Sequence, residues 1–523
     1  MQRPPVSLFS NFRGNLFGGL TAAVIALPLA LAFGVASGLG AAAGLYGAII
    51  LGFFAALFGG TPTQISGPTG PMTVVVAAAV ATLGGDIGLV ATVVLLAGIF
   101  QLVFGFTRVG RFVRFIPYPV ISGFMSGIGV IIILLQLNPL LGLPSDAAVL
   151  HLLVTLPSLL PQTNFWALLL ALAALAIVFF TPARLARVVP SPLIALVVLT
   201  PFSALLQLPV ETIGTIPAEL PALVLPDFKL EHYTVIISLA FTLAVLGTID
   251  TLLTSIVADS ITRTKHNPDR ELFGQGLGNT LCALVGAVPG AGATMRTVIN
   301  VKSGGTSNLS GMTHAVVLLL IVLFLAPLAS KIPLAVLAGI LIKVGVDILD
   351  YRFLKVWKES PRSDLMTMLT VFFVTVFVDL ITAVGLGIVL ASLLIVYRIT
   401  KETQIVLETA GAGTQQPDLE AKNARIIRIN GAFFFGSSTF FERQANNLLD
   451  TKTVIIDIMN VPFMDITAIF TLKDLIEKLK TDEVRVIIAA PEAFAGKLMR
   501  FNHEKRFENV DFAPSLQSAV ALI

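Results

Sequence analysis

Two ionisable side chains lie inside apolar stretches, and they are the residues of this sequence best suited to do chemistry. Asp250 lies within "LAVLGTIDTLLTSIVADS" (243–260), and Arg296 follows the glycine-rich stretch "AVPGAGATM" (287–295). A charged side chain at the centre of a bilayer costs about 3 kcal/mol and commonly marks the path of a substrate or ion. An arginine there can hold an anion, whereas an aspartate can hold a cation or a proton. A structural pair between Asp250 and Arg296 is the alternative interpretation.

Two short apolar segments each begin directly after a run of glycine and proline. The first run lies in "TPTQISGPTGPMTVVV" (61–76), and the second precedes Arg296. Such runs interrupt a helix, and unpaired backbone at membrane depth is tolerated only where it is buried in protein or lines a cavity. A helix that begins there presents free N–H groups and its positive dipole end, which attract an anion. Simple kinks in buried helices are the alternative. Hydroxyl groups that can assist are those of Thr69, Thr73, Thr294 and Thr297.

The composition places most of the chain in a membrane. Of 523 residues, 55% are hydrophobic and 12% are charged, and the mean hydropathy is +0.90. These values are far too apolar for a soluble protein of average composition. The net charge of +3 is spread over short loops, which argues against nucleic-acid binding. The single cysteine, Cys282, excludes a disulfide framework and a cysteine metal cluster.

The apolar region runs from residue 15 to residue 398 and leaves room for about 14 membrane-spanning helices. Basic residues test this count, because Lys and Arg gather in the cytosolic loops of membrane proteins. They fall in every second predicted loop, with Lys229 and Lys331 as exceptions, so both termini are predicted to be cytosolic. The predicted spans are 15–34, 41–60, 68–83, 87–107, 115–140, 164–181, 189–208, 232–259, 271–287, 293–302, 312–329, 333–349, 364–383 and 384–398.

The sequence contains an internal repeat. The stretch "IPYPVISGFMSGIGVI" (116–131) aligns without gaps with "IPLAVLAGILIKVGVD" (332–347), and these are the fifth and twelfth predicted spans. Because these spans are seven apart, the second unit of seven enters the membrane from the opposite side, which makes an inverted repeat. The same shift pairs the third span with the tenth, the two short helices that follow the glycine and proline runs. Their N-termini are therefore predicted to face each other, with Arg296 one turn into the tenth.

The eighth span carries the intramembrane acid, but its repeat mate does not. Thr254 lies one turn after Asp250 on the same helical face, whereas the first span has Pro28 and no charge. This asymmetry favours a single cation site. Asp347 lies nearer a cytosolic end and one turn from Lys343, so a structural salt bridge is predicted there.

Beyond residue 398 the pattern changes to short β runs that alternate with amphipathic helices. We expect a transmembrane domain at 1–398, a linker at 399–423 and a small cytosolic α/β domain at 424–523. The last domain shows no nucleophile elbow, P-loop or metal-ligand spacing, so a role in dimerisation or regulation is expected. Strands are predicted in 424–436, 453–461 and 484–490, and helices in 437–449 and 465–482.

Several motifs together resemble one transporter family. They are "GGLTAAVIALPLALAFGVASG", "GTPTQISGPTGPMTVV", "IDTLLTSIVADSITRT", "GQGLGN" and "GAGATM", followed by the α/β tail. They are similar to the SulP anion transporters of solute carrier family 26, and within it to BicA-type sodium-dependent bicarbonate transporters. The resemblance implies an α-helical polytopic membrane protein whose 7+7 inverted repeat forms core and gate domains that work by an elevator motion. It also implies a homodimer in the inner (plasma) membrane and a C-terminal STAS domain.

The resemblance further implies roles for individual residues. Two departures from the family pattern bear on substrate and regulation. An arginine at the position of Arg296 resembles the wider family, which carries sulfate, oxalate, chloride or dicarboxylates, whereas BicA-type transporters have a small residue. Ile466 occupies the place of the phosphorylated serine of antagonist STAS domains, with Thr467 beside it. The anion is expected on Thr69, Gly70, Ala293, Thr294 and Arg296, and sodium on Asp250, Thr254, Gly292 and Thr294.

The leading hypothesis is a secondary transporter that takes up a small inorganic anion, with bicarbonate in first place, by symport with sodium. The alternative is a proton-coupled or exchanging transporter of sulfate or a dicarboxylate, motivated by Arg296. A membrane-tethered signalling scaffold with the STAS domain as its output is a third hypothesis. An enzyme is the least favoured, because no organised set of acid, base and nucleophile is found. Besides the co-transported ion no cofactor is expected.

Overall fold

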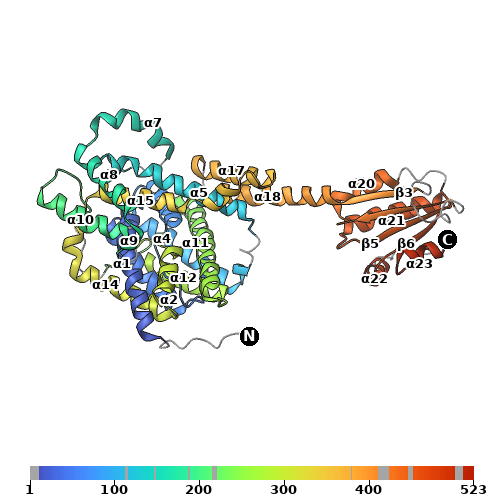
Figure 1. The fold of residues 1–523 in the computed structure, drawn as a ribbon, viewed down its shortest axis with the longest axis horizontal. Helices are drawn as coiled ribbons and strands as arrows, with labels where there is room; N and C mark the ends of the chain where they lie inside the picture. The colour runs from blue at the N-terminus through green and yellow to red at the C-terminus, as the bar shows by residue number, and fades with distance from the viewer. Residues whose placement is uncertain are drawn as a thin grey trace. The chain divides into compact units, whose positions relative to one another are not determined.

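The computed structural model describes residues 11–111, 116–145, 149–186, 189–214, 221–378, 380–409, 423–445, 451–500 and 510–523. The chain divides into two compact units, Met1–Ile388 and Val389–Ile523. The first unit is helical, and the second contains a β-sheet with helices on it (Figure 1).

A principal helix lies in each of the fourteen ranges in which a span is predicted. Among the described residues, six helices are long and apolar enough to cross a bilayer by themselves, and a seventh crossing results if the bent pair Val149–Gln162 and Phe165–Phe180 is one span. The helical membrane fold is thus confirmed, while the count of fourteen spans stays a prediction. The helices are α1 (Phe12–Ala36), α2 (Ala41–Phe58), α3 (Gly70–Thr82), α4 (Ile87–Phe106), α5 (Tyr118–Leu135), α8 (Phe165–Phe180), α10 (Ser191–Leu205), α11 (Tyr233–Thr262), α12 (Pro268–Ala283), α13 (Thr294–Lys302), α14 (Asn308–Ala329), α15 (Leu334–Ile348), α17 (Arg362–Phe377) and α18 (Leu380–Glu402).

Two of these helices are the shortest of the fourteen. The helix α3 has 13 residues and α13 has 9, whereas a span needs about 20. Each begins after a glycine and proline run, as the sequence predicts, and each is preceded by a residue with extended backbone, Thr69 or Ala293. Pro71 suits the first turn of α3, because its missing N–H and fixed φ do no harm there. We call α3 and α13 the half-helices.

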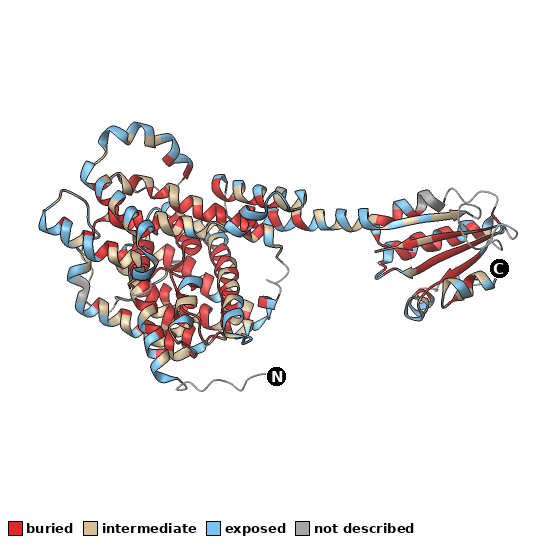
Figure 2. Ribbon diagram, in the orientation of Figure 1, coloured by how far each residue is buried: buried red, intermediate tan, exposed pale blue. Residues whose placement is uncertain are grey.

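The long helices pack into two bundles. In the core bundle, α12 packs on α2 and α4, α14 packs on α1 and α2, and α11 packs on α4. In the gate bundle, α5 packs on α15 and α17, α8 packs on α15, and α10 packs on α8. The half-helices lie against α1 and α11 of the core bundle. Buried residues gather where helices face one another, and exposed residues face outward (Figure 2).

The second unit contains a five-stranded sheet in the order β3-β4-β5-β6-β7. The strand β3 pairs antiparallel with β4, and the other neighbours are parallel. Alternate residues of β4 point to opposite faces, so Ile427 joins the core that contains Leu472 of α21, and Ile426 joins the core that contains Ala519 of α23. The elements are β3 (Gln404–Thr409), β4 (Ala424–Asn430), α20 (Phe435–Ala445), β5 (Thr453–Asn460), α21 (Ile466–Thr481), β6 (Arg485–Ala489), α22 (Glu492–Arg500), β7 (Asp511–Ala513) and α23 (Leu516–Ala521).

The three predicted strands appear as β4, β5 and β6, and the two predicted helices appear as α20 and α21. The structure adds β3, which lies within the range 399–423 that the sequence assigns to a linker. As an edge strand, β3 is paired on one side only, and Val406 is 42% exposed. An exposed strand needs fewer apolar residues, so its hydrophobic pattern in the sequence is weaker. Residues 410–422 of the linker range lie outside the described residues.

Candidate functional site

The two broken stretches meet as a short antiparallel pair of strands, β1 (Ser66–Gly67) and β2 (Ala291–Gly292). Ser66 pairs with Gly292, and Gly67 pairs with Ala291. Because β1 leads into α3 and β2 leads into α13, the two half-helices begin at one place and run away from it in opposite directions. Their N-termini therefore converge, as the inverted repeat predicts. Gly290 is required here, since a Cβ on it would overlap the carbonyl of Gly67.

Hydrogen bonds hold this crossing in place. The N–H of Ala293 donates to the Ile65 carbonyl at 2.8 Å, and the N–H of Ile65 donates to Thr297 Oγ1 at 3.0 Å. From α11, Thr251 Oγ1 accepts from the N–H of Gly292 at 3.0 Å. The Ala293 N–H is therefore occupied, and the N–H groups without a partner inside a helix are those of the first turns of the half-helices.

Within the predicted sodium set, Thr254 lies within hydrogen-bond distance of both Gly292 and Thr294. Thr254 Oγ1 lies 2.9 Å from the Gly292 carbonyl oxygen, to which it donates, and 2.6 Å from Thr294 Oγ1. Asp250, the fourth, lies one turn before Thr254 on α11, and its Oδ2 is buried. The structure thus brings hydroxyl and carbonyl oxygens together beside the start of α13, with the Asp250 carboxylate one turn away on α11. Oxygens of these kinds are the ligands that a hard cation such as sodium prefers.

Arg296 is 2% exposed and does not form a salt bridge with Asp250, although the two charges act on each other. Its Nη2 donates instead to the carbonyl of Pro68, next to the start of α3. This carbonyl would otherwise be left unpaired by the break before the helix. Arg296 therefore ties α13 to the stretch that precedes α3. The structural Asp250–Arg296 ion pair, the alternative from the sequence, is not formed.

Several polar atoms near the crossing are buried and have no hydrogen-bond partner in the described part of the chain. Three of them belong to predicted site residues: Thr69 Oγ1, Asp250 Oδ2 and Arg296 Nη1. Buried polar groups in proteins are nearly always paired, so a set of orphans indicates a place where ligands bind. The guanidinium nitrogen suits an anion and the carboxylate suits a cation. Thr69 and Arg296 both lie close enough to the Asp250 carboxylate to interact with it electrostatically.

The gate bundle covers the start of α3. A Cβ on Gly70 would lie 2.7 Å from Ile132 Cδ1 of α5 and 3.0 Å from Ile348 Cδ1 of α15. These two isoleucines occupy equivalent positions of the internal repeat, since the alignment of residue 116 with residue 332 extends to them. The predicted anion residue Gly70 therefore lies at the boundary between the two bundles, where a motion of one bundle past the other would expose it.

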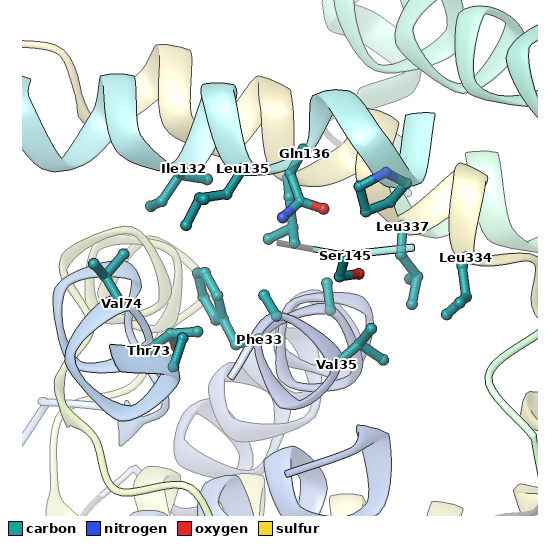
Figure 3. A pocket seen from close by; sticks show the side chains of 15 residues that line it. Phe33, Val35, Thr73, Val74, Ile132, Leu135, Gln136, Ser145, Leu334 and Leu337 are labelled. Atoms are coloured by element: carbon teal, nitrogen blue, oxygen red, sulfur yellow. The ribbon is translucent and has the colours of Figure 1, made fainter. Parts of the chain in front are cut away.

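A small cavity of about 40 Å³ lies between the bundles, next to α3 (Figure 3). Its walls come from α1, α3, α5 and α15, and its polar members are Thr73, Gln136 and Ser145. Figure 3 shows Phe33 and Thr73 on one side and Ile132 and Gln136 on the other. The space is large enough for a few water molecules. Thr73 lies one turn beyond Thr69 along α3, so the cavity adjoins the crossing.

Two buried residues near the crossing were not singled out in the sequence. Glu271 of α12 accepts from the N–H groups of Gly60 and Thr61, both at 2.8 Å, and from Gln64 Nε2 at 2.8 Å. It thereby fixes the chain that leads into β1. His314 of α14 is fully buried beside Arg296, and both of its ring nitrogens lack partners among the described residues. Glu271 follows "NPDR" at a loop, so nothing local distinguishes it from a loop charge.

Two lysines outside the crossing form ion pairs. Lys343 pairs with Asp347 one turn away, which confirms that salt bridge. Lys229, an exception to the charge rule, pairs with Asp86 at 2.9 Å and Asp227 at 3.1 Å. Its hydrogen bond to Asp86 lowers the pKa of that carboxyl and raises the pKa of Lys229. Lys229 therefore carries no uncompensated charge.

This chain is similar in sequence and in fold to known transport proteins. The bicarbonate transporter BicA of Synechocystis sp. is 46% identical over 488 residues, which cover 90% of this chain and 86% of that protein. The solved transmembrane domain of a cyanobacterium bicarbonate transporter BicA is 51% identical, with a TM-score of 0.68 over 72% of this chain and 98% of that one. The structure of SLC26A9 is 19% identical and has a TM-score of 0.84 over 98% of this chain and 90% of that one, a likeness of fold alone.

Family models cover both units. The model of the sulfate permease family matches residues 12–371, and the model of the STAS domain matches residues 416–519. The resemblance seen in the sequence motifs is thereby confirmed. With its paired half-helices and its α/β tail, this chain belongs to the sulfate permease family and carries a STAS domain.

Proposed function

We propose that this protein is a secondary active transporter that takes up bicarbonate together with sodium. The observation that carries the proposal is the convergence of the two half-helix N-termini on a buried cluster of oxygens from α11 and β2. Positive helix ends favour an anion, and the oxygens favour a hard cation. Two ions of opposite charge bound together lower the cost of holding either one inside a membrane. The similarity to bicarbonate transporters supports this choice of anion.

The anion is proposed to bind at the first turns of α3 and α13. Thr69 Oγ1 and Thr294 Oγ1 supply hydroxyl donors, and Arg296 Nη1 supplies a buried positive charge. Gly70 and Ala293 contribute small size, which lets the anion approach the main-chain N–H groups closely. A bicarbonate ion has both a charged oxygen pair and a hydroxyl, so it can accept from these donors and donate to an oxygen of the site.

Sodium is proposed to bind Asp250, Thr254, Gly292 and Thr294. The Thr254 hydroxyl already lies 2.9 Å from the Gly292 carbonyl oxygen and 2.6 Å from the Thr294 hydroxyl. Sodium would replace their mutual hydrogen bonds with coordination and satisfy Asp250 Oδ2. Because Thr294 belongs to both proposed sets, binding of one ion orders the site of the other. This shared residue supplies the coupling between the two fluxes.

The experiment that tests this function is uptake of labelled bicarbonate and labelled sulfate into proteoliposomes, with and without an inward sodium gradient. We expect sodium-dependent uptake of bicarbonate and little uptake of sulfate. Asp250→Asn should abolish the sodium dependence, whereas its matched control Asp347→Asn, at a partly exposed salt bridge, should retain it. Uptake that is independent of the sodium gradient for every anion would contradict symport with sodium.

Arg296 favours a second candidate, a proton-coupled or exchanging transporter of sulfate or a dicarboxylate. A divalent anion is attracted to a full positive charge more strongly than a monovalent one is. Arg296 is a fully buried cation whose Nη1 is unpaired in the described residues. Under this function Arg296→Gly abolishes uptake of sulfate or dicarboxylate. Unaltered uptake of these anions by the variant would count against it.

We further propose an elevator motion of the core bundle against the gate bundle, a homodimer, and an inner membrane orientation with both termini in the cytosol. The position of Gly70 at the boundary of the bundles supports the motion, and the alternation of basic loops supports the orientation. Single cysteines placed at Gln162 and Lys358, in a Cys282→Ala background, test the orientation in intact cells. An impermeant thiol reagent should label the first and spare the second.

The STAS domain is proposed to serve assembly or regulation, and no catalytic role is proposed for either unit. A chain that ends at Glu402 removes the whole sheet, including β3. Sodium-dependent uptake by this shortened chain would support the transporter function and confine the STAS domain to assembly or regulation. Loss of uptake with a folded transmembrane domain would favour the signalling scaffold or an essential role for the tail.

A further inference from the structure

Lys331 is a basic residue on the side of the membrane where the sequence predicts few of them. Lys229, on the same predicted side, is neutralised by Asp86 and Asp227. Lys331 is exposed directly after α14, and no ion pair involves it within the described ranges. Within the described residues, therefore, no acidic side chain pairs with its charge, at a place where the topology rule disfavours a charge.

A polar pocket of about 430 Å³ lies beside Lys331. It is formed by the end of α10, the loop after it and the residues that follow α14. Hydroxyl and amide groups of Ser203, Gln207, Thr212 and Ser330 line it together with Lys331. Such a mixture of one cation and several neutral donors suits a phosphate group esterified to a polar alcohol.

An apolar groove of about 310 Å³ adjoins this pocket. Its walls come from α1, α2, α10 and α14 and include Leu31, Val197 and Ile321, and Thr200 is the one polar residue among the described residues that line it. The Thr200 hydroxyl is buried and has no hydrogen-bond partner in the described ranges. A groove of this kind suits a hydrocarbon chain, because each buried CH₂ contributes about 0.8 kcal/mol to binding.

The groove and the pocket follow each other along the same two segments. Along α10, Pro201 lines the groove and Ser203 lines the pocket, and after α14, Ala329 lines the groove and Ser330 lines the pocket. The surface therefore changes from apolar to polar and cationic over a few residues. A ligand that fits both parts has a hydrocarbon tail joined to an anionic head group.

We propose that this surface binds an anionic phospholipid of the membrane leaflet opposite the chain termini, with an acyl chain in the groove and the phosphate at Lys331. A lipid is the amphiphile that a membrane presents at this depth, and a lysine near the surface attracts anionic lipid by about 1 kcal/mol. The groove is shared by α10 of the gate bundle and by α1, α2 and α14 of the core bundle. A bound lipid thus contacts both bundles.

The test is native mass spectrometry of the delipidated full chain, titrated with phosphatidylglycerol and with zwitterionic phosphatidylcholine. We expect one phosphatidylglycerol molecule per chain, bound about fivefold more tightly than phosphatidylcholine because of the lysine charge. Lys331→Gln should abolish this preference. Lys358→Gln, an exposed lysine outside the groove, should retain it.

A second pair of variants tests the groove itself. Val197 and Val198 are neighbours on α10, 62% and 51% exposed, but only Val197 lines the groove. Val197→Trp should fill the groove and reduce binding of both lipids at least tenfold, while Val198→Trp should bind both as the unmodified chain does. Equal binding by the two tryptophan variants, or equal affinity of the unmodified chain for the two lipids, would overturn the proposal. Thermal melting of each purified variant shows that it is folded.

Discussion

Gly129 and Gly345 lie face to face where α5 crosses α15. A Cβ on Gly129 would be 2.6 Å from the Gly345 carbonyl oxygen, and a Cβ on Gly345 would be 2.7 Å from the Gly129 carbonyl oxygen. The two glycines are also equivalent positions of the internal repeat, which aligns residues 116–131 with 332–347. The two halves of the repeat therefore cross at a symmetric pair, and the missing side chains allow the helices to touch.

Gly129→Ala and Gly345→Ala should each destabilise the transmembrane unit by about 1–3 kcal/mol, because a methyl group placed against a carbonyl forces the helices apart. Thermal melting of the purified protein in detergent measures the loss. Gly385→Ala on α18 is the matched control, since a Cβ there meets no atom within 4 Å. Melting temperatures that fall equally for all three variants would contradict a specific role for the crossing.

Thr254→Val should raise the sodium concentration needed for half-maximal uptake about tenfold, since a lost hydrogen bond or ligand is worth roughly 1.4 kcal/mol. The variant keeps the shape of the side chain but removes the oxygen that bonds to Gly292 and Thr294. Uptake measured against sodium concentration reports the effect. Thr262→Val, near the end of the same helix, removes a hydroxyl that bonds only locally, to Ala258 and Thr264, and should leave the sodium curve unchanged.

Glu271→Gln should destabilise the transmembrane unit by about 1.5–3 kcal/mol, the range for hydrogen bonds to a charged group. The carboxylate accepts from two main-chain N–H groups and two glutamine side chains, and an amide would turn a donor toward some of them. Chemical or thermal unfolding measures the change. Asp269→Asn, which breaks a surface pair with Arg111, should cost less than about 1 kcal/mol. A similar decrease in the free energy of unfolding for both variants would show that the buried hydrogen bonds of Glu271 contribute no more than a surface ion pair.

The pair of Asp86 with Lys229 should stabilise the protein over a wide pH range. Hydrogen bonding lowers the Asp86 pKa below 3.8, so this contribution is present above that value and is lost as pH falls through the lowered pKa. It raises the Lys229 pKa above 10.5, so the contribution is present below that value and is lost as pH rises through the raised pKa.

Lys229→Met should therefore lower the melting temperature slightly and by a constant amount between about pH 5 and about pH 9, with the difference shrinking in stronger acid. High salt should reduce the difference, because the pair is exposed and is screened. Lys331→Met, a lysine without an ion pair in the described structure, is the control. A difference that grows as the pH falls below 3.8 would contradict this assignment.

Local sequence patterns were enough to predict the helical membrane fold, the inverted repeat and the two half-helices. Glycine and proline change the conformation of their own backbone, so the residues at the breaks before α3 and α13 are enough to predict these breaks. The same is true of the Lys343–Asp347 pair, whose partners are one turn apart on a helix. The equivalence of Gly129 and Gly345 also follows from the sequence, because residues 116–131 align without gaps with residues 332–347.

Only the tertiary structure decided what Arg296 and Glu271 bind. Sequence reasoning offered Asp250 as the partner of Arg296, but the guanidinium donates to the Pro68 carbonyl, 228 positions away. Glu271 accepts from Gly60, 211 positions away, and nothing beside it in the sequence reveals that it is buried. Residue types and spacing determine which helices form, where they break and which charges lie inside them. The choice of partner depends on how distant segments pack, because a buried polar group bonds to whichever donor or acceptor the fold brings within reach.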